Sequence, residues 1–299
     1  MEITRLQKPV KQLMPYGFFI LSIFVINLTT TYECSVKLLA KKIYKSLLYF
    51  GFDARRFLEA LSPKKTSWYE KDFIELKKQK GADTTFTFGT PFPIVNDKDD
   101  QGGIMKGHYF HQDLYIARKI FEANPQKHVD IGSRTDGFIA HVASYRGIEL
   151  LDIRPIESSV KNITFRQANL MELPNDLVNY TDSISSLHAL EHFGLGRYGD
   201  PIDYWGYLKA IQNITSILKH DGRFYFSVPI GPQRIEFNAH RVFSLQYLIS
   251  IIQPNYDIAE FSYVNDSGEF FEKVELTDQI IASNCNCDYG CGIFILRKR

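Results

Sequence analysis

The sequence is poor in cysteine and tryptophan and has almost no excess of charge of either sign. It contains four cysteines and two tryptophans in 299 residues. So few cysteines in a chain of this length argue against a disulfide framework and favour a reducing compartment. Lysine and arginine total 35 and acidic residues 34, so the overall charge gives no sign of a nucleic-acid partner.

The sequence also has few Cys and His residues at the spacings that are typical of metal sites. Cys285, Cys287 and Cys291 form a C-x-C-x3-C cluster, but no second Cys or His pair at metal spacing accompanies it, and an apolar run follows Cys291. His108 and His111 are spaced as H-x-x-H without a third placed ligand. We therefore predict no metal site, and we expect His108, His111 and the nearby Asp113 to cap a ligand pocket.

Long apolar runs are limited to one N-terminal segment. Residues 12–32 contain no charge, but Asn27 and three threonines dilute the far end of the segment. A membrane span needs roughly 20 apolar residues, so a signal anchor, a signal peptide and a buried helix all remain open. Basic residues on both sides leave the orientation of an anchor undecided.

A basic amphipathic stretch follows at residues 35–52, with leucines on one helical face and lysines on the other. Such a helix can lie on an anionic membrane or dock on a domain with its lysines solvated. A loop rich in Gly, Pro and Asp then spans 81–103. We expect a hydrophobic segment at 1–33, a basic helical extension and loop at 34–106, and the main domain at 107–299.

In the main domain, apolar strand-like runs alternate with helical periodicity, without repeats or low-complexity tracts. This alternation predicts a doubly wound α/β domain with a mostly parallel sheet covered on both faces. We expect strands at 128–132, 148–152, 163–167, 182–187, 222–228, 258–264 and 291–297, and helices at 136–146, 203–219 and 244–252.

The run HVDIGSRTDG, residues 128–137, is the centre of this pattern. It indicates a short strand that turns at Gly132 and then opens a helix, the geometry that brings backbone amides up to a nucleotide-like ligand. Asp152 ends the next strand, 20 positions after Gly132. An acidic residue there can accept hydrogen bonds from ribose hydroxyls, although an Asp at a strand end is also a common turn residue.

Four runs carry a family resemblance: HYFHQD, HVDIGSRTDGF, LLDIRP and LHALEHFGLGRYGDP. Over roughly residues 107–264 they resemble class I S-adenosylmethionine-dependent methyltransferases, and more closely a related domain-of-unknown-function family named for Caenorhabditis proteins. The resemblance implies a Rossmann-like methyltransferase fold with a seven-stranded sheet, and S-adenosyl-L-methionine as cofactor.

The resemblance also implies which residues bind the cofactor. The usual D-x-G-x-G-x-G loop has glycines where this sequence has Arg134 and Asp136, so Arg134 either pairs with the cofactor carboxylate or closes the pocket. Asn169 stands where an Asp commonly contacts the adenine amino group. The implied cofactor residues are Asp130, Gly132, Ser133, Arg134, Gly137, Asp152, Asn169, Leu170 and His188.

On the acceptor side the resemblance places Glu191 and His192, and His240 lies in a loop that commonly forms the acceptor wall. A His that titrates near neutral pH suits a general base for methyl transfer to a hydroxyl. A structural histidine is the alternative at each position. The glycine-rich loop 194–201 is expected to fold over a substrate.

These expectations lead to a methyltransferase acting on a small polar acceptor, with a glycan or lipid-linked sugar hydroxyl as one choice. The alternatives are an inactive methyltransferase-like scaffold at a membrane assembly and a sugar-nucleotide-binding protein. Cofactor supply favours the cytoplasm, with membrane contact through residues 12–52. The sequence does not indicate an oligomeric state.

Overall fold

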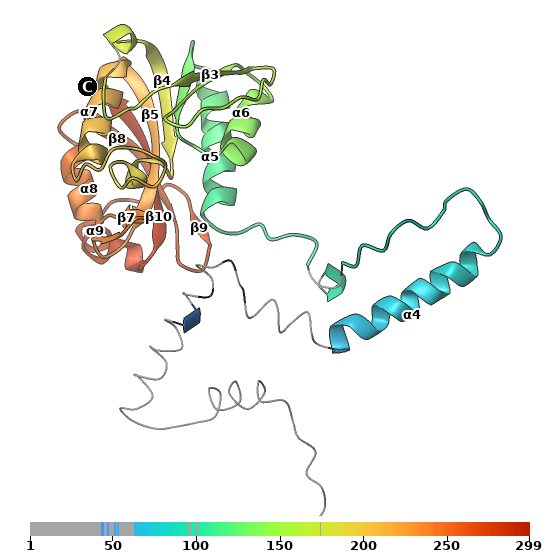
Figure 1. The fold of residues 1–299 in the computed structure, drawn as a ribbon. Coiled ribbons are helices and arrows are strands. Elements are labelled where there is room, and N and C mark those ends of the chain that lie inside the picture. The colour runs from blue at the N-terminus through green and yellow to red at the C-terminus, as the bar shows by residue number, and fades with distance from the viewer. Residues whose placement is uncertain are drawn as a thin grey trace, which may run out of the picture. The chain divides into compact units, whose positions relative to one another are not determined.

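The computed structural model describes residues 63–94, 97–99, 101–173 and 175–299, with five isolated positions between 43 and 53 (Figure 1). The predicted hydrophobic segment at 1–33 lies outside the described residues, as does most of the amphipathic stretch at 35–52. The chain divides into two compact units, residues 1–103 and residues 104–299, which are described separately.

The described part of the first unit consists mainly of one long helix, α4 (Pro63–Lys80), and a short 3-10 turn, η1 (Asp97–Asp99). Proline suits the first helical position because it lacks the amide hydrogen that would be unpaired there. Three lysines in the last turn of α4 complement the negative end of the helix dipole. Among the described residues, no helix combines the length and the apolar character that crossing a bilayer requires.

The second unit is an α/β domain. Its helices are α5 (His108–Ala123), α6 (Ala140–Ala143), α7 (Gly206–Ile217), α8 (Leu245–Ile252) and α9 (Asp278–Ser283), with short helical turns η2 (Thr135–Ile139), η3 (Asn175–Leu177), η4 (Leu190–His192) and η5 (Asn284–Asn286). Its strands are β1 (His128–Ile131), β2 (Ile148–Asp152), β3 (Ile163–Gln167), β4 (Thr181–Leu187), β5 (Leu218–Ile230), β6 (Arg234–Glu236), β7 (His240–Val242), β8 (Tyr256–Val264), β9 (Phe270–Phe271) and β10 (Gly290–Lys298).

Eight strands form one sheet in the order β3-β2-β1-β4-β5-β10-β8-β9. The five strands from β3 to β5 are parallel. Strand β10 is inserted between β5 and β8 and runs antiparallel to both. Strands β6 and β7 form a separate hairpin.

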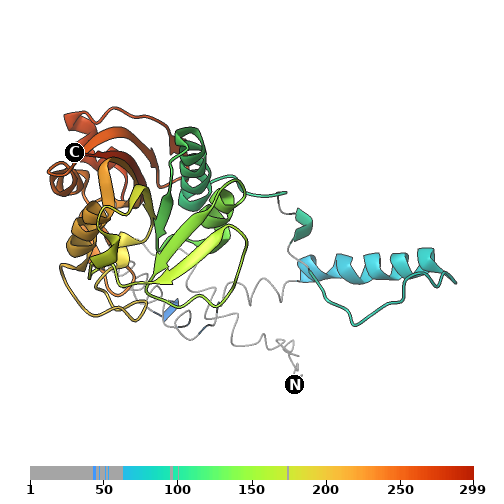
Figure 2. The same cartoon turned by 90° about the horizontal axis from the view of Figure 1, so that it is seen from above.

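Helices cover both faces of the sheet. Residues of α5, η2 and α6 pack against one face, and residues of α7 and α8 pack against the other. Each face of the sheet has its own hydrophobic core, and successive side chains of β5 point alternately into the two. Phe224 and Phe226 face α7 and α8, while Tyr225 faces α5. Figures 1 and 2 show the two helical layers on opposite sides of the sheet.

The predicted doubly wound fold and its seven strands are confirmed, and the two-residue strand β9 extends the sheet by one. The predicted helix at 136–146 is wrong in detail. Residues 135–139 wind as a π-helical turn, and only 140–143 continue as an α-helix. The helix expected at 203–219 spans 206–217, because the backbone becomes extended at Leu218, where β5 begins.

Candidate functional site

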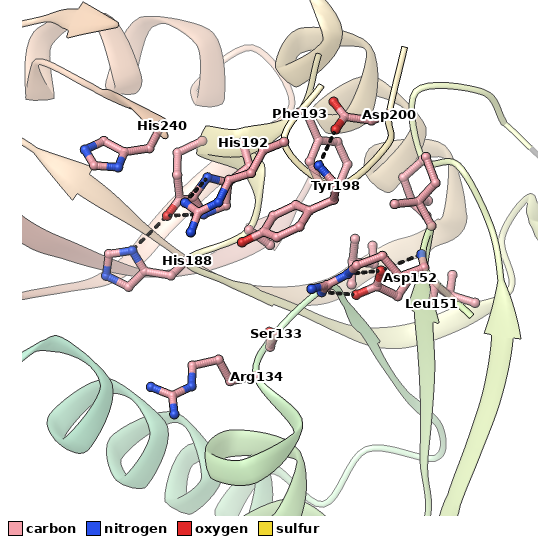
Figure 3. A pocket seen from close by; sticks show the side chains of 18 of the residues that line it. Ser133, Arg134, Leu151, Asp152, His188, His192, Phe193, Tyr198, Asp200 and His240 are labelled. Carbon is pink, nitrogen blue, oxygen red and sulfur yellow. Dashed lines mark hydrogen bonds and ion pairs between the residues drawn. The ribbon is translucent and has the colours of Figure 1, made fainter. Parts of the chain in front are cut away.

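A cavity of about 700 Å³ lies at the carboxyl ends of β1, β2, β3 and β4. Strands β1 and β4 are neighbours where the strand order changes direction, and open α/β sheets bind ligands at this point. Figure 3 shows His188, His192 and His240 toward one end of the cavity and Asp152 toward the other. We call these the histidine end and the acidic end.

The turn after β1 is built by Asp130. Its carboxylate accepts hydrogen bonds from the Ser133 amide (2.9 Å) and hydroxyl (2.6 Å), and from the Ser185 hydroxyl of β4. Burial raises the pKa of Asp130 to about 7, against the effect of these three hydrogen bonds. Gly132 has a φ of +69°, which glycine adopts without strain. Asp130 therefore shapes the loop from beneath, while Gly132 and Ser133 line the cavity.

At the acidic end, Asp152 closes β2 and lines the cavity. Arg154 donates to both of its oxygens, from the backbone amide and Nε to Oδ1 (2.8 and 3.0 Å) and from a terminal guanidinium nitrogen to Oδ2 (2.7 Å). The guanidinium also lies over the Tyr198 ring, 4.3 Å from its centroid. Each carboxylate oxygen accepts about two hydrogen bonds, so Oδ2 keeps one acceptor position for a ligand.

Arg134 forms a local ion pair. It donates to both carboxylate oxygens of Asp136, at 3.0 and 2.8 Å, and its guanidinium lies 4.5 Å from the centroid of the Tyr109 ring. Side-chain exposures of 50% and 70% leave this pair in solvent. The pair raises the pKa of Arg134 and lowers that of Asp136, chiefly through their hydrogen bonds. Arg134 is one of the residues that line the cavity.

Asn169 and Leu170 follow β3 and line the wall of the same cavity. The Asn169 side-chain oxygen accepts a hydrogen bond from the Met171 amide at 3.1 Å. The side-chain oxygen keeps a second acceptor position for a ligand, as expected from the sequence, and the amide nitrogen offers donors beside it. Leu170 is buried and supplies apolar surface.

The histidine end begins at His188, which follows β4 with a φ of +50°, an uncommon conformation for a residue with a side chain. Its Nδ1 lies 2.8 Å from Oε1 of Glu191, and both side chains are buried. Burial opposes charge on each residue. Nevertheless Cys291 and Glu191 raise the pKa of His188 well above its usual value, and His188 lowers the pKa of Glu191. The two residues form a buried ion pair.

His192 is oriented by the backbone. Its Nδ1 lies 2.6 Å from the carbonyl oxygen of Ala239, so this nitrogen carries the hydrogen and Nε2 is left as the basic atom. Burial lowers the pKa of His192, although Glu191 opposes this effect, and the ring stays neutral at pH 7. A neutral imidazole with a fixed tautomer on the wall of a cavity has the properties of a general base.

His240, at the start of β7, lines the cavity at its histidine end (Figure 3). Its Nε2 is buried and lies 3.5 Å from Oε2 of Glu236, and it makes no hydrogen bond among the described residues. Burial lowers the pKa of His240. Its ring contacts Tyr289, whose centroid lies 5.1 Å away.

Ten of the twelve predicted site residues line this one cavity, and Asp130 and Gly137 do not. Gly137 has a packing role: a Cβ there would lie 2.2 Å from Oδ2 of Asp113 on α5. His108, His111 and Asp113 were expected to cap the pocket, but the cavity wall includes none of them. Tyr109, between them in sequence, lines the cavity instead.

Sequence reasoning missed Arg154 and Tyr289, and it noted Arg197 and Tyr198 only as part of a loop. Arg154 was within the quoted run LLDIRP, so its spacing from Asp152 was an available signal. Tyr289 precedes β10 and no local pattern indicates its role. The loop after η4 is fixed by Asp200, whose carboxylate accepts from the amides of Gly194, Gly196 and Tyr198.

The sheet order and the inserted antiparallel β10 define a Rossmann-like methyltransferase fold. The chain belongs to the family described as Caenorhabditis protein of unknown function, DUF268, whose model matches residues 149–299. The family match takes in β10, which the resemblance at 107–264 did not, and leaves out the β1 turn.

Solved structures with similar folds include methyltransferases, at low identity to this chain. The N-methyltransferase NodS from Bradyrhizobium japonicum WM9, in complex with S-adenosylhomocysteine, is 12% identical with a TM-score of 0.42, covering 64% of this chain and 88% of its own. The 1,6-didemethyltoxoflavin-N1-methyltransferase from Burkholderia thailandensis is 14% identical with a TM-score of 0.45, covering 79% and 90%. An S-adenosylmethionine-dependent methyltransferase from Clostridium acetobutylicum is 12% identical with a TM-score of 0.43, covering 63% and 91%. No curated protein matches the sequence.

Proposed function

We propose that the protein binds S-adenosyl-L-methionine and transfers its methyl group to a small polar acceptor. One observation carries this proposal: the Gly132 turn after β1 and Asp152 at the end of the neighbouring β2 line the same cavity, beside the switch point of the sheet. The turn suits close approach of a ligand to the backbone, and the carboxylate suits ribose hydroxyls. Asn169 and Leu170, which follow the next strand β3, line the same cavity, and we assign the adenine to their side of it.

The histidine end supplies the acceptor chemistry. Bound S-adenosyl-L-methionine would supply the methyl group and leave as S-adenosylhomocysteine, and His192 would take the proton of the acceptor hydroxyl at Nε2. Nε2 is available because Nδ1 is committed to Ala239. Glu191 acts through its neighbours and not on the acceptor, because its carboxylate is buried against His188. His240 lines the acceptor wall.

Sugar hydroxyls, free or lipid-linked, are the acceptors to screen first, because Arg197, Tyr198 and His240 offer hydrogen bonds around one cavity wall. The supply of the cofactor places this activity in the cytoplasm, with membrane contact through residues 12–52 as a further proposal. The screen should compare His192→Gln with His220→Gln, an exposed histidine away from the cavity. General-base loss predicts a rate about 10²–10⁴-fold lower for His192→Gln only.

The cofactor is tested by calorimetric titration of the full chain with S-adenosylmethionine and S-adenosylhomocysteine. We expect a dissociation constant in the micromolar range, about −8 kcal/mol. Asp152→Ala should weaken binding roughly 10- to 100-fold, since hydrogen bonds to a charged group contribute about 1.5–3 kcal/mol. Asp176→Ala is the matched control, because Asp176 also pairs with an arginine but lies outside the cavity. A folded protein that gives no heat with either ligand contradicts the proposal.

A second candidate, binding of a sugar nucleotide, is favoured by one observation. Arg154 occupies three of the acceptor positions of Asp152, and its guanidinium lines the cavity where it can meet a phosphate. Arg154→Ala separates the two candidates. Removal of the arginine frees Asp152 for a ribose and should keep or tighten binding of S-adenosylmethionine, whereas it should weaken binding of uridine diphosphate glucose.

A further inference from the structure

The fold brings together three metal-ligating side chains that are far apart in the sequence. His108 begins α5, His188 follows β4, and Cys291 lies in β10. One nitrogen from each histidine and the sulfur of Cys291 all lie within 4.8 Å of one another. The His108 and His188 rings are stacked, with centroids 5.2 Å apart and an interplanar angle of 6°. Neither sequence pattern considered for a metal, H-x-x-H or C-x-C-x3-C, contains this combination.

The hydrogen bonds of His188 leave one of its two ring nitrogens without a partner. Its Nδ1 is held by the Glu191 carboxylate at 2.8 Å, but its Nε2 is buried and makes no hydrogen bond among the described residues. A buried nitrogen without a partner costs free energy. Metal-binding histidines commonly have this arrangement, in which a carboxylate fixes one ring nitrogen and directs the other to the ion.

The donor set suits zinc. Two imidazoles and one thiolate are borderline-soft ligands, and zinc binds such sets tetrahedrally. Bond lengths of about 2.0–2.3 Å imply ligand atoms roughly 3.3–3.6 Å apart, so the separations in the cluster, which are at most 4.8 Å, must shorten by up to about 1.5 Å. His108 is only partly buried and can make this adjustment.

We propose that His108, His188 and Cys291 bind one zinc ion, with Glu191 positioning His188. Binding forms a zinc–sulfur bond and two zinc–nitrogen bonds, and the protons of the thiol and of the His188 ring pass to solvent. Three protein ligands leave a fourth position open for water or for a ligand from the cavity. His188 and Tyr289, which both stack on His108, line that cavity, so the ion would lie in its wall.

Without a metal, the same thiol has a weak partner, because the Cys291 sulfur lies 3.6 Å from Oε1 of Gln112. A cluster of structural residues that binds no ion is therefore the competing explanation. The two explanations differ in what divalent cobalt, a spectroscopic substitute for zinc, would show on binding.

The experiment titrates the metal-free full chain with cobalt and then displaces cobalt with zinc. We expect one cobalt per chain, a tetrahedral visible spectrum and a sulfur-to-cobalt charge-transfer band. Cys291→Ser should remove the charge-transfer band, and His108→Asn should weaken binding at least tenfold. His111→Asn on the same helix and Cys287→Ser near the same strand are matched controls and should bind as the wild type does.

His108→Asn is the decisive variant because His108 is partly exposed and its loss leaves the buried His188–Glu191 pair intact. Circular dichroism and thermal melts show whether each variant is folded. The proposal is overturned if the folded wild type binds no cobalt, or if its spectrum is the same in Cys291→Ser. It is also overturned if His108→Asn and His111→Asn bind cobalt equally well.

Discussion

The two ends of the cavity hold their charges in opposite ways. At the acidic end, Asp152 pairs with Arg154, whose side chain is about half exposed. At the histidine end, the His188–Glu191 pair is buried, and His188 and Glu191 each keep one atom without a hydrogen bond among the described residues. Exposed arginine pairs can exchange partners with a ligand at small cost, whereas buried unpaired atoms carry a standing desolvation penalty.

This difference indicates a division of labour. The acidic end can accept and release a ligand by rearranging solvated side chains. The histidine end is fixed by burial and by backbone contacts such as His192 to Ala239, so its geometry is set before any ligand arrives. Preorganised polar groups of this kind are typical of sites that perform chemistry.

The largest expected effect tests the burial of the histidine end. Glu191→Gln removes the charge that His188 needs, and breaking a buried ion pair typically costs about 3–5 kcal/mol. We expect the free energy of unfolding in urea to fall by about this amount in the metal-free protein. A loss below about 1 kcal/mol would mean that the pair is solvated, and the contrast between the two ends would disappear.

A second prediction concerns a buried polar residue at the amino end of β1. His128 places its ring nitrogens 2.8 and 3.0 Å from the hydroxyls of Ser183 and Ser185, and burial lowers its pKa from 6.5 to about 3. Below 6.5 the unfolded chain binds a proton that the folded chain does not, so the contribution of neutral His128 to stability is lost as the pH falls.

The comparison of wild type with His128→Asn isolates this contribution. The stability difference between the two proteins should shrink by about 1.4 kcal/mol per pH unit as the pH falls below 6.5, or about 2 kcal/mol over one and a half units. Urea unfolding at several pH values measures it. Burial also raises the pKa of Asp130 to about 7. If His128→Asn leaves the surroundings of Asp130 unchanged, the titration of Asp130 affects both proteins equally and cancels from the stability difference. A stability difference that does not change with pH would show that His128 takes up a proton as readily in the folded protein as in the unfolded chain.

The smallest expected effect is at Arg134. Its pair with Asp136 is exposed, so Arg134→Gln should change the free energy of unfolding by less than about 0.5 kcal/mol. Calorimetry on the same variant distinguishes the two roles left open by the sequence. Weaker binding of S-adenosylmethionine identifies Arg134 as a partner of the cofactor carboxylate, and tighter binding identifies it as an obstruction. A stability loss comparable to that of Glu191→Gln would contradict the small contribution expected from an exposed ion pair.

The sequence predicted the sheet well because its central strands are short apolar runs bounded by turns. It also placed Gly132, Asp152 and His188 at one edge, since the carboxyl ends of parallel strands meet there. It could not predict that Asp130 holds Ser133 and Ser185 beneath the turn, which depends on the pairing of β1 with β4, or that Gly137 accommodates Asp113, which depends on how α5 packs. Nor could it join His108 to Cys291, which lie 183 positions apart and meet only through the antiparallel insertion of β10.

That insertion also governs how the domain can be made. Strand β10 hydrogen-bonds to β5 on one side and to β8 on the other, so each of these strands lacks one of its two neighbours until residues 290–298 have been synthesised. A chain interrupted before Gly290 would expose two unpaired strand edges beside phenylalanine-rich faces, a combination that promotes aggregation. Premature termination is therefore expected to yield insoluble protein and not a shortened soluble domain, even though all the residues that line the cavity come before residue 290.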